Sequence, residues 1–205
     1  MPEGVSGHLF VLSAPSGVGK STMVRALLAR DSRLRFSVSC TTRAPRPGET
    51  DGVDYHFLTR DTFEEGIRGG RFLEWAHVYG HYYGTDRRHV EAWLADGFDV
   101  LLEIDVQGAR KVRASGLAAT TIFILPPTLS ALEERLRRRR TETEDVIRRR
   151  LDAAEAEIRE APWYDYLVVN DVLEEAVTDV SAIIRACRCE RTRAHRALTP
   201  FLPLL

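Results

Sequence analysis

The 205-residue chain has the composition of one folded globular domain. Hydrophobic residues make up 44% and charged residues 29%, with 14 Gly and 9 Pro, which excludes a fibrous or disordered chain and supplies enough apolar material for a core. The 29 basic and 30 acidic residues give a net charge of −1, so no overall field attracts the molecule to nucleic acid or to an anionic membrane. Any anion site must therefore be local.

The chain carries no sign of export or of a covalent framework. Its first residues lack the basic and apolar regions of a signal peptide, and no apolar run approaches the roughly 18 residues that span a bilayer. Its three cysteines, Cys40, Cys187 and Cys189, are an odd number with no second pair at metal-ligand spacing. We therefore expect a cytoplasmic protein without a membrane partner, a disulfide or a cysteine-bound metal.

Four apolar segments have the composition of buried strands, and helix-like segments lie between them. They are near-continuous runs of strand-forming residues, typical of parallel strands covered on both faces, at 8–13, 98–104, 119–125 and 166–169. Amphipathic patterns follow the first and the last of them, at Ser21–Leu28 and Leu173–Cys187. This alternation predicts an α/β fold with a doubly wound parallel sheet.

Two stretches depart from this alternation, and we expect them to be insertions in a single domain spanning 1–205. The stretch 36–94 combines short polar strand candidates with turn residues and aromatics, which indicates a mixed β insertion. The stretch 130–160 is charged and helical, with Thr141 as a possible N-cap in its middle, which fits a helical hairpin. The core of the domain then consists of 8–35, 95–129 and 161–190.

A glycine-containing loop between the first strand and the first helix has the layout of a P-loop. Ala14–Ser21 (APSGVGKS) fits seven of the eight positions of G-x-x-x-x-G-K-[ST], with alanine in place of the first glycine. Gly17 and Gly19 would turn backbone N–H groups inward onto phosphate oxygens. Lys20 would reach the β and γ phosphates, and the Ser21 hydroxyl would hold Mg²⁺. The alternative is a glycine-rich turn that only begins a helix.

Basic positions in this chain are filled almost entirely by arginine. Of the 29 basic residues, 27 are Arg and only Lys20 and Lys111 are Lys. Lysine carries a compact charge on a thin side chain, whereas the planar guanidinium is wider, so a narrow backbone cradle admits lysine more easily. This contrast supports a P-loop around Lys20.

A P-loop indicates a nucleoside triphosphate, and the insertion after it indicates the second substrate. Four segments of the insertion resemble the guanylate kinase family in residue type, order and spacing: Ser39–Glu49 (SCTTRAPRPGE), Asp54–Phe57, Phe72–Glu74 and Tyr82–Thr85. The resemblance extends over about 9–187 and implies a kinase that transfers the γ-phosphoryl group of ATP to GMP. It also implies ATP contacts from the P-loop and its neighbours: Ala14, Pro15, Ser16, Gly17, Val18, Gly19, Lys20, Ser21, Thr22 and Arg135.

The resemblance implies that Arg43, Arg46 and Tyr55 bind the phosphate of GMP, and the residue types agree with this role. A 5′-monophosphate is a dianion, and two arginines three residues apart, flanked by prolines, present rigid forked donors to it. By the same resemblance, Tyr83 would add a second phenol beside Tyr55. The alternatives are two solvated charges in a turn and tyrosines that only fill a core.

Glu74 is the candidate for recognition of guanine. It lies among apolar neighbours, where an unpaired carboxylate is costly to bury, and a carboxylate can accept both the N1–H and the 2-amino group of guanine. Adenine would place an acceptor against it, which predicts a preference for GMP over AMP. The resemblance adds Ser39 and Thr85 as hydroxyl partners of the guanine O6.

Asp105 ends the second apolar strand, and ligands collect at the carboxyl ends of strands in open α/β sheets. In the family that the chain resembles, this position lies near GMP and the metal. Asp105 would therefore bind Mg²⁺ together with Ser21, or position GMP. A plain helix cap is the alternative.

The helical stretch concentrates positive charge. Between Arg135 and Arg150 the chain has eight arginines and three acidic residues, a local net charge of +5. A solvated face explains most of them, but Arg139 and Arg150 flank a turn that resembles the lid of the family, where arginines contact the transferred phosphoryl group. Phosphoryl transfer requires charge neutralisation and alignment rather than a base. We therefore expect both insertions to close over the substrates, with these catalytic residues: Lys20, Arg46, Arg139 and Arg150.

Other functions fit part of the pattern. A non-catalytic guanylate-kinase-like module would bind phosphorylated peptides through the arginine pocket, but such modules typically lack the intact Gly19–Ser21 segment. A P-loop kinase acting on a phosphorylated sugar would have no need of Glu74. Nucleic-acid binding by the arginine run is disfavoured, because the run contains no aromatic residue on which bases could stack.

Overall fold

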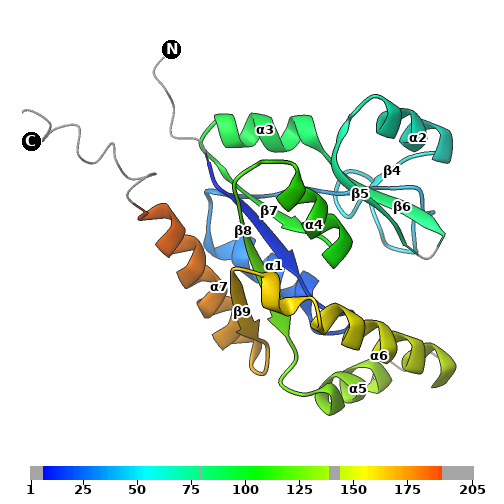
Figure 1. Cartoon of the computed structure of the whole chain (residues 1–205), viewed down its shortest axis with the longest axis vertical. Helices are drawn as coiled ribbons and strands as arrows, with labels where there is room; N and C mark the ends of the chain where they lie inside the picture. The colour runs from blue at the N-terminus through cyan, green and yellow to red at the C-terminus, as the bar shows by residue number, and fades with distance from the viewer. Residues whose placement is uncertain (1–6, 79, 139–143, 191–205) are drawn as a thin grey trace, which may run out of the picture.

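The computed structural model describes residues 7–78, 80–138 and 144–190, and a five-stranded parallel sheet forms its centre (Figure 1). The strands, in their spatial order, are β2 (Leu34–Phe36), β7 (Asp99–Glu103), β1 (Leu9–Ser13), β8 (Ala119–Leu125) and β9 (Tyr166–Val169). All four predicted apolar segments form strands of this sheet, with bounds within one residue of those expected. The predicted α/β fold with a parallel sheet is confirmed.

Helices cover both faces of this sheet. Alternate residues of β1 point to opposite faces, and apolar side chains on both faces must be buried. Phe10 and Leu12 belong to a buried cluster with residues of α1, α5, α6 and α7, whereas Leu9 and Val11 belong to a second cluster with residues of α3 and α4. The bounds of these helices are α1 (Lys20–Arg30), α3 (Arg87–Ala95), α4 (Val106–Ala114), α5 (Leu129–Arg138), α6 (Glu144–Ile158) and α7 (Leu173–Arg188). The sheet is thus doubly wound, as expected.

The edge strand β2 is the one core strand that the sequence pattern did not indicate. It has only three residues and contains Arg35, so it lacks the apolar run that marked the others. Its pairing with β7 places Leu34 opposite Asp99 and Phe36 opposite Leu101. Phe36, the first residue of the stretch expected to be the insertion, therefore lies in the core sheet.

A second, four-stranded sheet lies at one end of the core (Figure 1). Its strands, in spatial order, are β4 (His56–Phe57), β3 (Cys40–Thr41), β6 (His81–Asp86) and β5 (Phe72–Val78). β3 pairs with β4 in parallel, but with β6 antiparallel, and β5 and β6 are antiparallel. The expected mixed β insertion is confirmed, and α2 (Arg60–Arg68) packs Phe63 into a small core of its own.

The stretch expected to be a helical hairpin contains α5 and α6, which lie side by side below the carboxyl ends of the sheet in Figure 1. Leu132 and Leu136 of α5 and Ile147 of α6 are buried in the cluster that covers β1. Thr141, the expected N-cap, lies outside the described residues. Among the helices of the described ranges, none has the length and apolarity needed to cross a lipid bilayer.

Candidate active site

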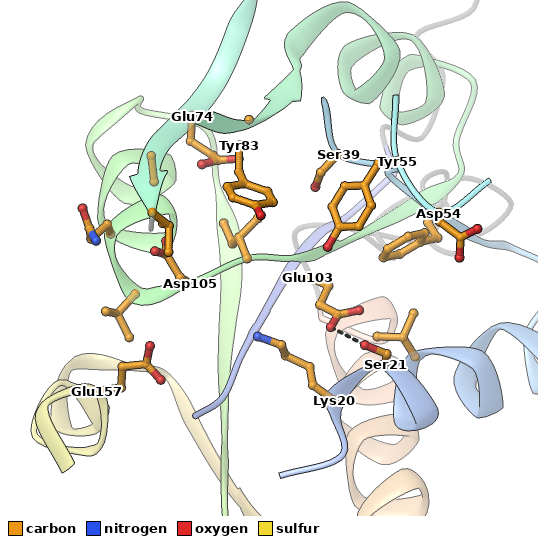
Figure 2. A pocket seen from close by; sticks show the side chains of 18 of the residues that line it. Lys20, Ser21, Ser39, Asp54, Tyr55, Glu74, Tyr83, Glu103, Asp105 and Glu157 are labelled. Atoms are coloured by element: carbon orange, nitrogen blue, oxygen red, sulfur yellow. Dashed lines mark hydrogen bonds between the residues drawn. The ribbon is translucent and has the colours of Figure 1, made fainter. Parts of the chain in front are cut away.

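A single cavity of about 1120 Å³ lies between the carboxyl ends of the core strands, the second sheet and α6 (Figure 2). Its walls come from segments far apart in the sequence, including α1, β5, β6, β7 and α6. Eight residues singled out from the sequence line it: Lys20, Ser21, Ser39, Arg46, Tyr55, Glu74, Tyr83 and Asp105. The P-loop lysine and six of the eight residues expected to contact GMP therefore share one cavity, whereas Arg43 and Thr85 do not line it.

The P-loop connects β1 to α1 and leaves the N-terminus of α1 without a side-chain cap. Gly17 and Gly19 have φ angles of 95° and 101°, a region that L side chains rarely adopt. Gly19 is the N-cap residue, with no side-chain hydrogen bond, and the first turn of α1 contains no acidic residue. Helix N-terminal N–H groups without such partners are favourable sites for phosphate oxygens.

Neighbouring elements hold the P-loop from behind. A Cβ on Gly17 would come within 2.7 Å of the Leu136 Cδ2 atom of α5, so glycine permits a close approach there. The Asn170 side-chain amide donates a hydrogen bond of 2.7 Å to the Val18 carbonyl oxygen. Arg135 donates to the carbonyl oxygens of the segment after β9, at 2.9 Å to Asn170 and 3.2 Å to Asp171. Its guanidinium thus stabilises the segment that supports the P-loop.

The two functional side chains of the P-loop point toward carboxylates. The Lys20 Nζ atom lies 3.4 Å from the Ala14 carbonyl oxygen, and Figure 2 shows the side chain pointing toward the space beside Asp105 and Glu157. The Ser21 hydroxyl donates a hydrogen bond of 2.9 Å to the Glu103 carboxylate. Glu103 was not singled out from the sequence. It ends β7, the strand next to β1, and an acid in such a position commonly holds Mg²⁺ together with the P-loop hydroxyl.

These residues fit a magnesium ion held partly by the nucleotide. Within the described residues, no three Asp, Glu, His or Cys side chains converge into a metal-binding group. Mg²⁺ prefers oxygen ligands and usually takes one or two from protein side chains and the rest from substrate phosphates and water. The Ser21 hydroxyl and the carboxylates of Glu103 and Asp105, all lining the cavity, match that donor set.

Glu49 joins the two arginines that the sequence predicted to bind phosphate. Arg43, whose side chain is only 12% exposed, forms a 2.8 Å salt bridge with Glu49, which raises the pKa of Arg43. The same Glu49 carboxylate accepts a 2.7 Å hydrogen bond from the Arg46 backbone N–H. The Arg46 side chain lines the cavity and forms no salt bridge with the described residues. Arg46 is thus the more available of the two guanidinium groups.

Two phenols and a serine lie beside this arginine pair. The rings of Tyr55 and Tyr83 have centroids 6.0 Å apart in an edge-on arrangement, and both hydroxyls point into the cavity in Figure 2. Burial raises the pKa of Tyr55, so its hydroxyl stays protonated and available as a donor. Ser39 lies next to Tyr55 on the same wall. This wall presents neutral and cationic donors together.

Glu74 lies on β5, the strand paired with the β6 strand that carries Tyr83, and is only 4% exposed. Its Oε1 atom accepts a 2.7 Å hydrogen bond from the Thr85 hydroxyl of β6. Burial raises the pKa of Glu74 to about 7, with a further rise from Asp105, against the lowering effects of the Thr85 bond and of Lys111. The sequence expectation of a buried carboxylate is confirmed, while Thr85 contacts this acid directly.

Asp105 and Glu157 add two further carboxylates to the lining of the cavity. The Asp105 Oδ1 atom accepts a 2.8 Å hydrogen bond from the Gly108 N–H and caps α4, while the residue also lines the cavity. Both sequence readings of Asp105, helix cap and site residue, are therefore compatible with its position. Glu157 of α6 was not singled out from the sequence. Burial raises the pKa of Glu157, against a smaller lowering effect of the Lys20 charge.

Of the two predicted lid arginines, the structure describes one. The Arg150 guanidinium on α6 donates a 3.1 Å hydrogen bond to the Ser16 hydroxyl, which places it against the P-loop. Arg139 lies outside the described residues. Of the remaining ATP candidates, Pro15 is buried in the P-loop and Thr22 is exposed in the first turn of α1.

A P-loop that shares one cavity with a guanidinium and phenol pocket and a buried carboxylate defines the class: a nucleotide-dependent phosphotransferase. Comparison with known proteins agrees. The family model described as Guanylate kinase matches residues 6–187, and the chain belongs to the guanylate kinase family. This confirms both the resemblance read from the sequence and the expected enzyme class.

The similarity extends over nearly the full length of individual relatives. A guanylate kinase of Symbiobacterium thermophilum is 50% identical over 198 residues, which is 97% of this chain and 94% of the relative. One of Thermus thermophilus is 53% identical over 196 residues, 96% of this chain and 87% of the relative. The crystal structure of guanylate kinase from Anaplasma phagocytophilum superposes with a TM-score of 0.78 at 36% identity, covering 94% of this chain and 93% of that one.

Proposed function

We propose that this protein transfers the γ-phosphoryl group of ATP to GMP, giving ADP and GDP, and that the cavity described above is its active site. Family membership supports the reaction. The observation that carries the assignment of the site is the meeting of Lys20 with Arg46 and Glu74 in one cavity. A donor phosphate and an acceptor phosphate bound there can reach each other without crossing the protein.

On the donor side, the backbone N–H groups between Gly17 and Lys20 bind the ATP phosphates, and the Lys20 ammonium neutralises the β and γ oxygens. Ser21, Glu103 and Asp105 would hold Mg²⁺, which when bound supplies positive charge to the phosphate oxygens. Remaining donor contacts come from Ala14, Pro15, Ser16, Thr22 and Arg135. The contact between Arg135 and Asn170 supports a role at the edge of this site.

On the acceptor side, Arg46 and the phenols of Tyr55 and Tyr83 bind the GMP phosphate, while Arg43 acts beside them with its guanidinium fixed by Glu49. Glu74, as the carboxylate, accepts the two donors of the guanine edge. Further contacts to the base come from Ser39, Thr85 and Asp105. In this arrangement cationic groups meet the phosphate and acids meet the base, which favours a single binding direction.

Transfer itself requires alignment and charge neutralisation, because the GMP phosphate is already an anionic nucleophile. Lys20 and Arg46, which both line the cavity, neutralise it, and Arg150 and Arg139 complete the positive charge from the helical hairpin. We propose that the hairpin and the second sheet move toward the core when both nucleotides are bound, as lids that exclude water. The moving parts are then the insertion, which begins after Phe36 of the core sheet and extends to residue 94, and the stretch 130–160.

We also propose a cytoplasmic location. Cys40 and Cys189 are thiols without a disulfide, which is typical of proteins in reducing compartments.

A phosphotransfer assay with a nucleotide panel tests the function. With ATP·Mg²⁺ as donor, we expect kcat/KM for GMP to exceed that for AMP by about 10³-fold or more, because adenine leaves the buried Glu74 unpaired. Lys20→Ala should lower kcat by roughly 10³-fold. Arg30→Ala is the matched control, since Arg30 ends the same helix and pairs with Glu174 on the surface. Equal use of AMP and GMP, or a fully active Lys20→Ala variant, would refute the assignment.

A further inference from the structure

One face of α4 lies against the strand that carries Glu74. β5 is an edge strand of the second sheet, so the carbonyl groups on its outer side have no strand partner. α4 packs along this outer side, and Gly108 and Lys111, three residues apart, occupy the same face of the helix. Both contact β5 at Glu74 or at its neighbour Trp75.

Gly108 provides the space that the Glu74 carboxylate occupies. A Cβ atom built on Gly108 would lie 2.6 Å from Glu74 Oε2 and 3.2 Å from its Cδ atom. Ordinary van der Waals contact begins at 3.4 Å, so the carboxylate would have to retreat by about 0.8 Å. Alanine is otherwise the better residue inside a helix. Gly108 is buried in α4, and its missing side chain is what lets an acid approach the helix this closely.

Lys111 fixes β5 from the next turn of the same helix. Its Nζ atom donates a short hydrogen bond to the Trp75 carbonyl oxygen and lies 3.8 Å from the centroid of the Trp75 ring. This carbonyl belongs to the residue directly after Glu74, so the bond restrains the backbone from which the carboxylate extends. The ammonium also brings a positive charge near Glu74.

We infer that Gly108 and Lys111 of α4 are positioning residues that set the location of the Glu74 carboxylate and thereby determine specificity for the guanine base. Neither residue needs to touch the nucleotide. Gly108 sets how far Glu74 can withdraw toward the core, and Lys111 prevents β5 from moving away from α4. The inference rests on the proposed role of Glu74, which its test must examine separately.

The first test is steric. Gly108→Ala should raise the KM for GMP about 10- to 100-fold, because a displacement near 1 Å at a recognition group costs up to about 10²-fold. The kcat at saturating GMP and the KM for ATP should change less than threefold. Glu74→Asp shortens the acid by one methylene and removes the clash. The double variant should therefore have a KM for GMP no higher than Glu74→Asp alone; additive losses would overturn the steric role of Gly108.

The second test is independent of packing at Gly108. Lys111→Met keeps an unbranched side chain but removes the ammonium, and we expect the KM for GMP to rise three- to tenfold with kcat within twofold. Lys111→Arg restores the charge and should recover part of the affinity. Arg113→Met is the matched control, because Arg113 is a cation of the same helix whose guanidinium donates to the Trp163 carbonyl oxygen. An equal effect of Arg113→Met would show general damage to α4 and overturn the inference.

The proposed function and the inference fail in different ways. If Glu74→Gln leaves the KM for GMP unchanged, the role of Glu74 in the proposed function is wrong. If Glu74→Gln impairs GMP use while Gly108→Ala and Lys111→Met do not, the proposed function stands and the inference is wrong.

Discussion

Replacing Glu74 by glutamine is expected to stabilise the nucleotide-free protein while impairing its use of GMP. The carboxylate is 4% exposed, and burial raises its pKa from the usual 4.5 to about 7. The folded protein therefore holds this proton more tightly than the unfolded chain does. The contribution of Glu74 to the free energy of unfolding is most favourable below pH 4.5 and is lost as the pH rises through about 7, because the folded state must then keep a poorly solvated charge.

The size of the effect follows from the two pKa values. One unit of pKa corresponds to about 1.4 kcal/mol, so the rise from 4.5 to about 7 amounts to roughly 3 kcal/mol of stability lost by pH 8. Glutamine carries no charge at any of these pH values, and its side-chain oxygen can still accept the hydrogen bond from Thr85. The difference in free energy of unfolding between Glu74→Gln and the wild type should therefore grow in favour of the variant from pH 5 to pH 8.

Urea denaturation of nucleotide-free protein at pH 5, 6, 7 and 8 measures this difference. Glu91→Gln is the control, since Glu91 is a half-exposed surface acid paired with Arg87 at 3.3 Å, and its effect should stay within about 0.5 kcal/mol at every pH. A difference for Glu74→Gln that is flat across the range, or a variant less stable than the wild type at pH 8, would refute the reasoning.

Three further predictions follow from the same contacts. GMP affinity should fall as the pH drops below about 7, approaching tenfold per pH unit, because guanine needs ionised Glu74. Thr85, Asp105 and Lys111 also face this acid. Titration calorimetry measures the pH profile of GMP affinity, and the Glu74→Gln variant should lack the part of the profile that is due to Glu74. Gly19→Ala should lower the free energy of unfolding by roughly 1–3 kcal/mol and weaken ATP binding, since φ of Gly19 is 101° and the new Cβ would lie 3.2 Å from the Asn170 amide nitrogen. An unchanged midpoint of urea denaturation would contradict this. Arg71→Met should lower the free energy of unfolding by about 3 kcal/mol, because it removes the salt-bridge partner that lies 2.7 Å from the buried Asp86, which is 3% exposed. A loss below about 1 kcal/mol in urea denaturation would show that the other contacts of Asp86 suffice.

The parts of the fold that the sequence predicted well are those specified by neighbouring residues. Near-continuous apolar runs produced β1, β7, β8 and β9 almost to the residue, because strands buried on both faces tolerate few polar side chains. The P-loop was equally readable, since its glycines and Lys20 lie within one short segment. β2 escaped prediction because three residues that include Arg35 are too short to show a period.

The parts that the sequence did not predict depend on contacts between distant segments. Glu49 neutralises Arg43 from only six residues away, yet no periodic pattern identifies which of two nearby arginines an acid will bind. Glu157 reaches the cavity from α6, more than 130 residues after Lys20, and only the packing of the hairpin brings them together. Lys111 was visible as one of two lysines, but its partner, a carbonyl on an edge strand, has no sequence signal at all.

The distribution of charge in the cavity also decides how GMP can enter. Arg46, the two phenols, the buried Glu74 and Asp105 all line the cavity. Figure 2 shows Tyr83 between Glu74 and Tyr55. In the proposed orientation the phosphate dianion meets donors and the guanine N–H groups meet a carboxylate. The reverse orientation would place the phosphate dianion against a buried acid, which like-charge repulsion disfavours strongly, and would leave the arginine facing a neutral base. An exposed carboxylate would be hydrated and would repel the wrong orientation less, because water screens the charge. The same burial that lowers stability above neutral pH therefore provides the discrimination.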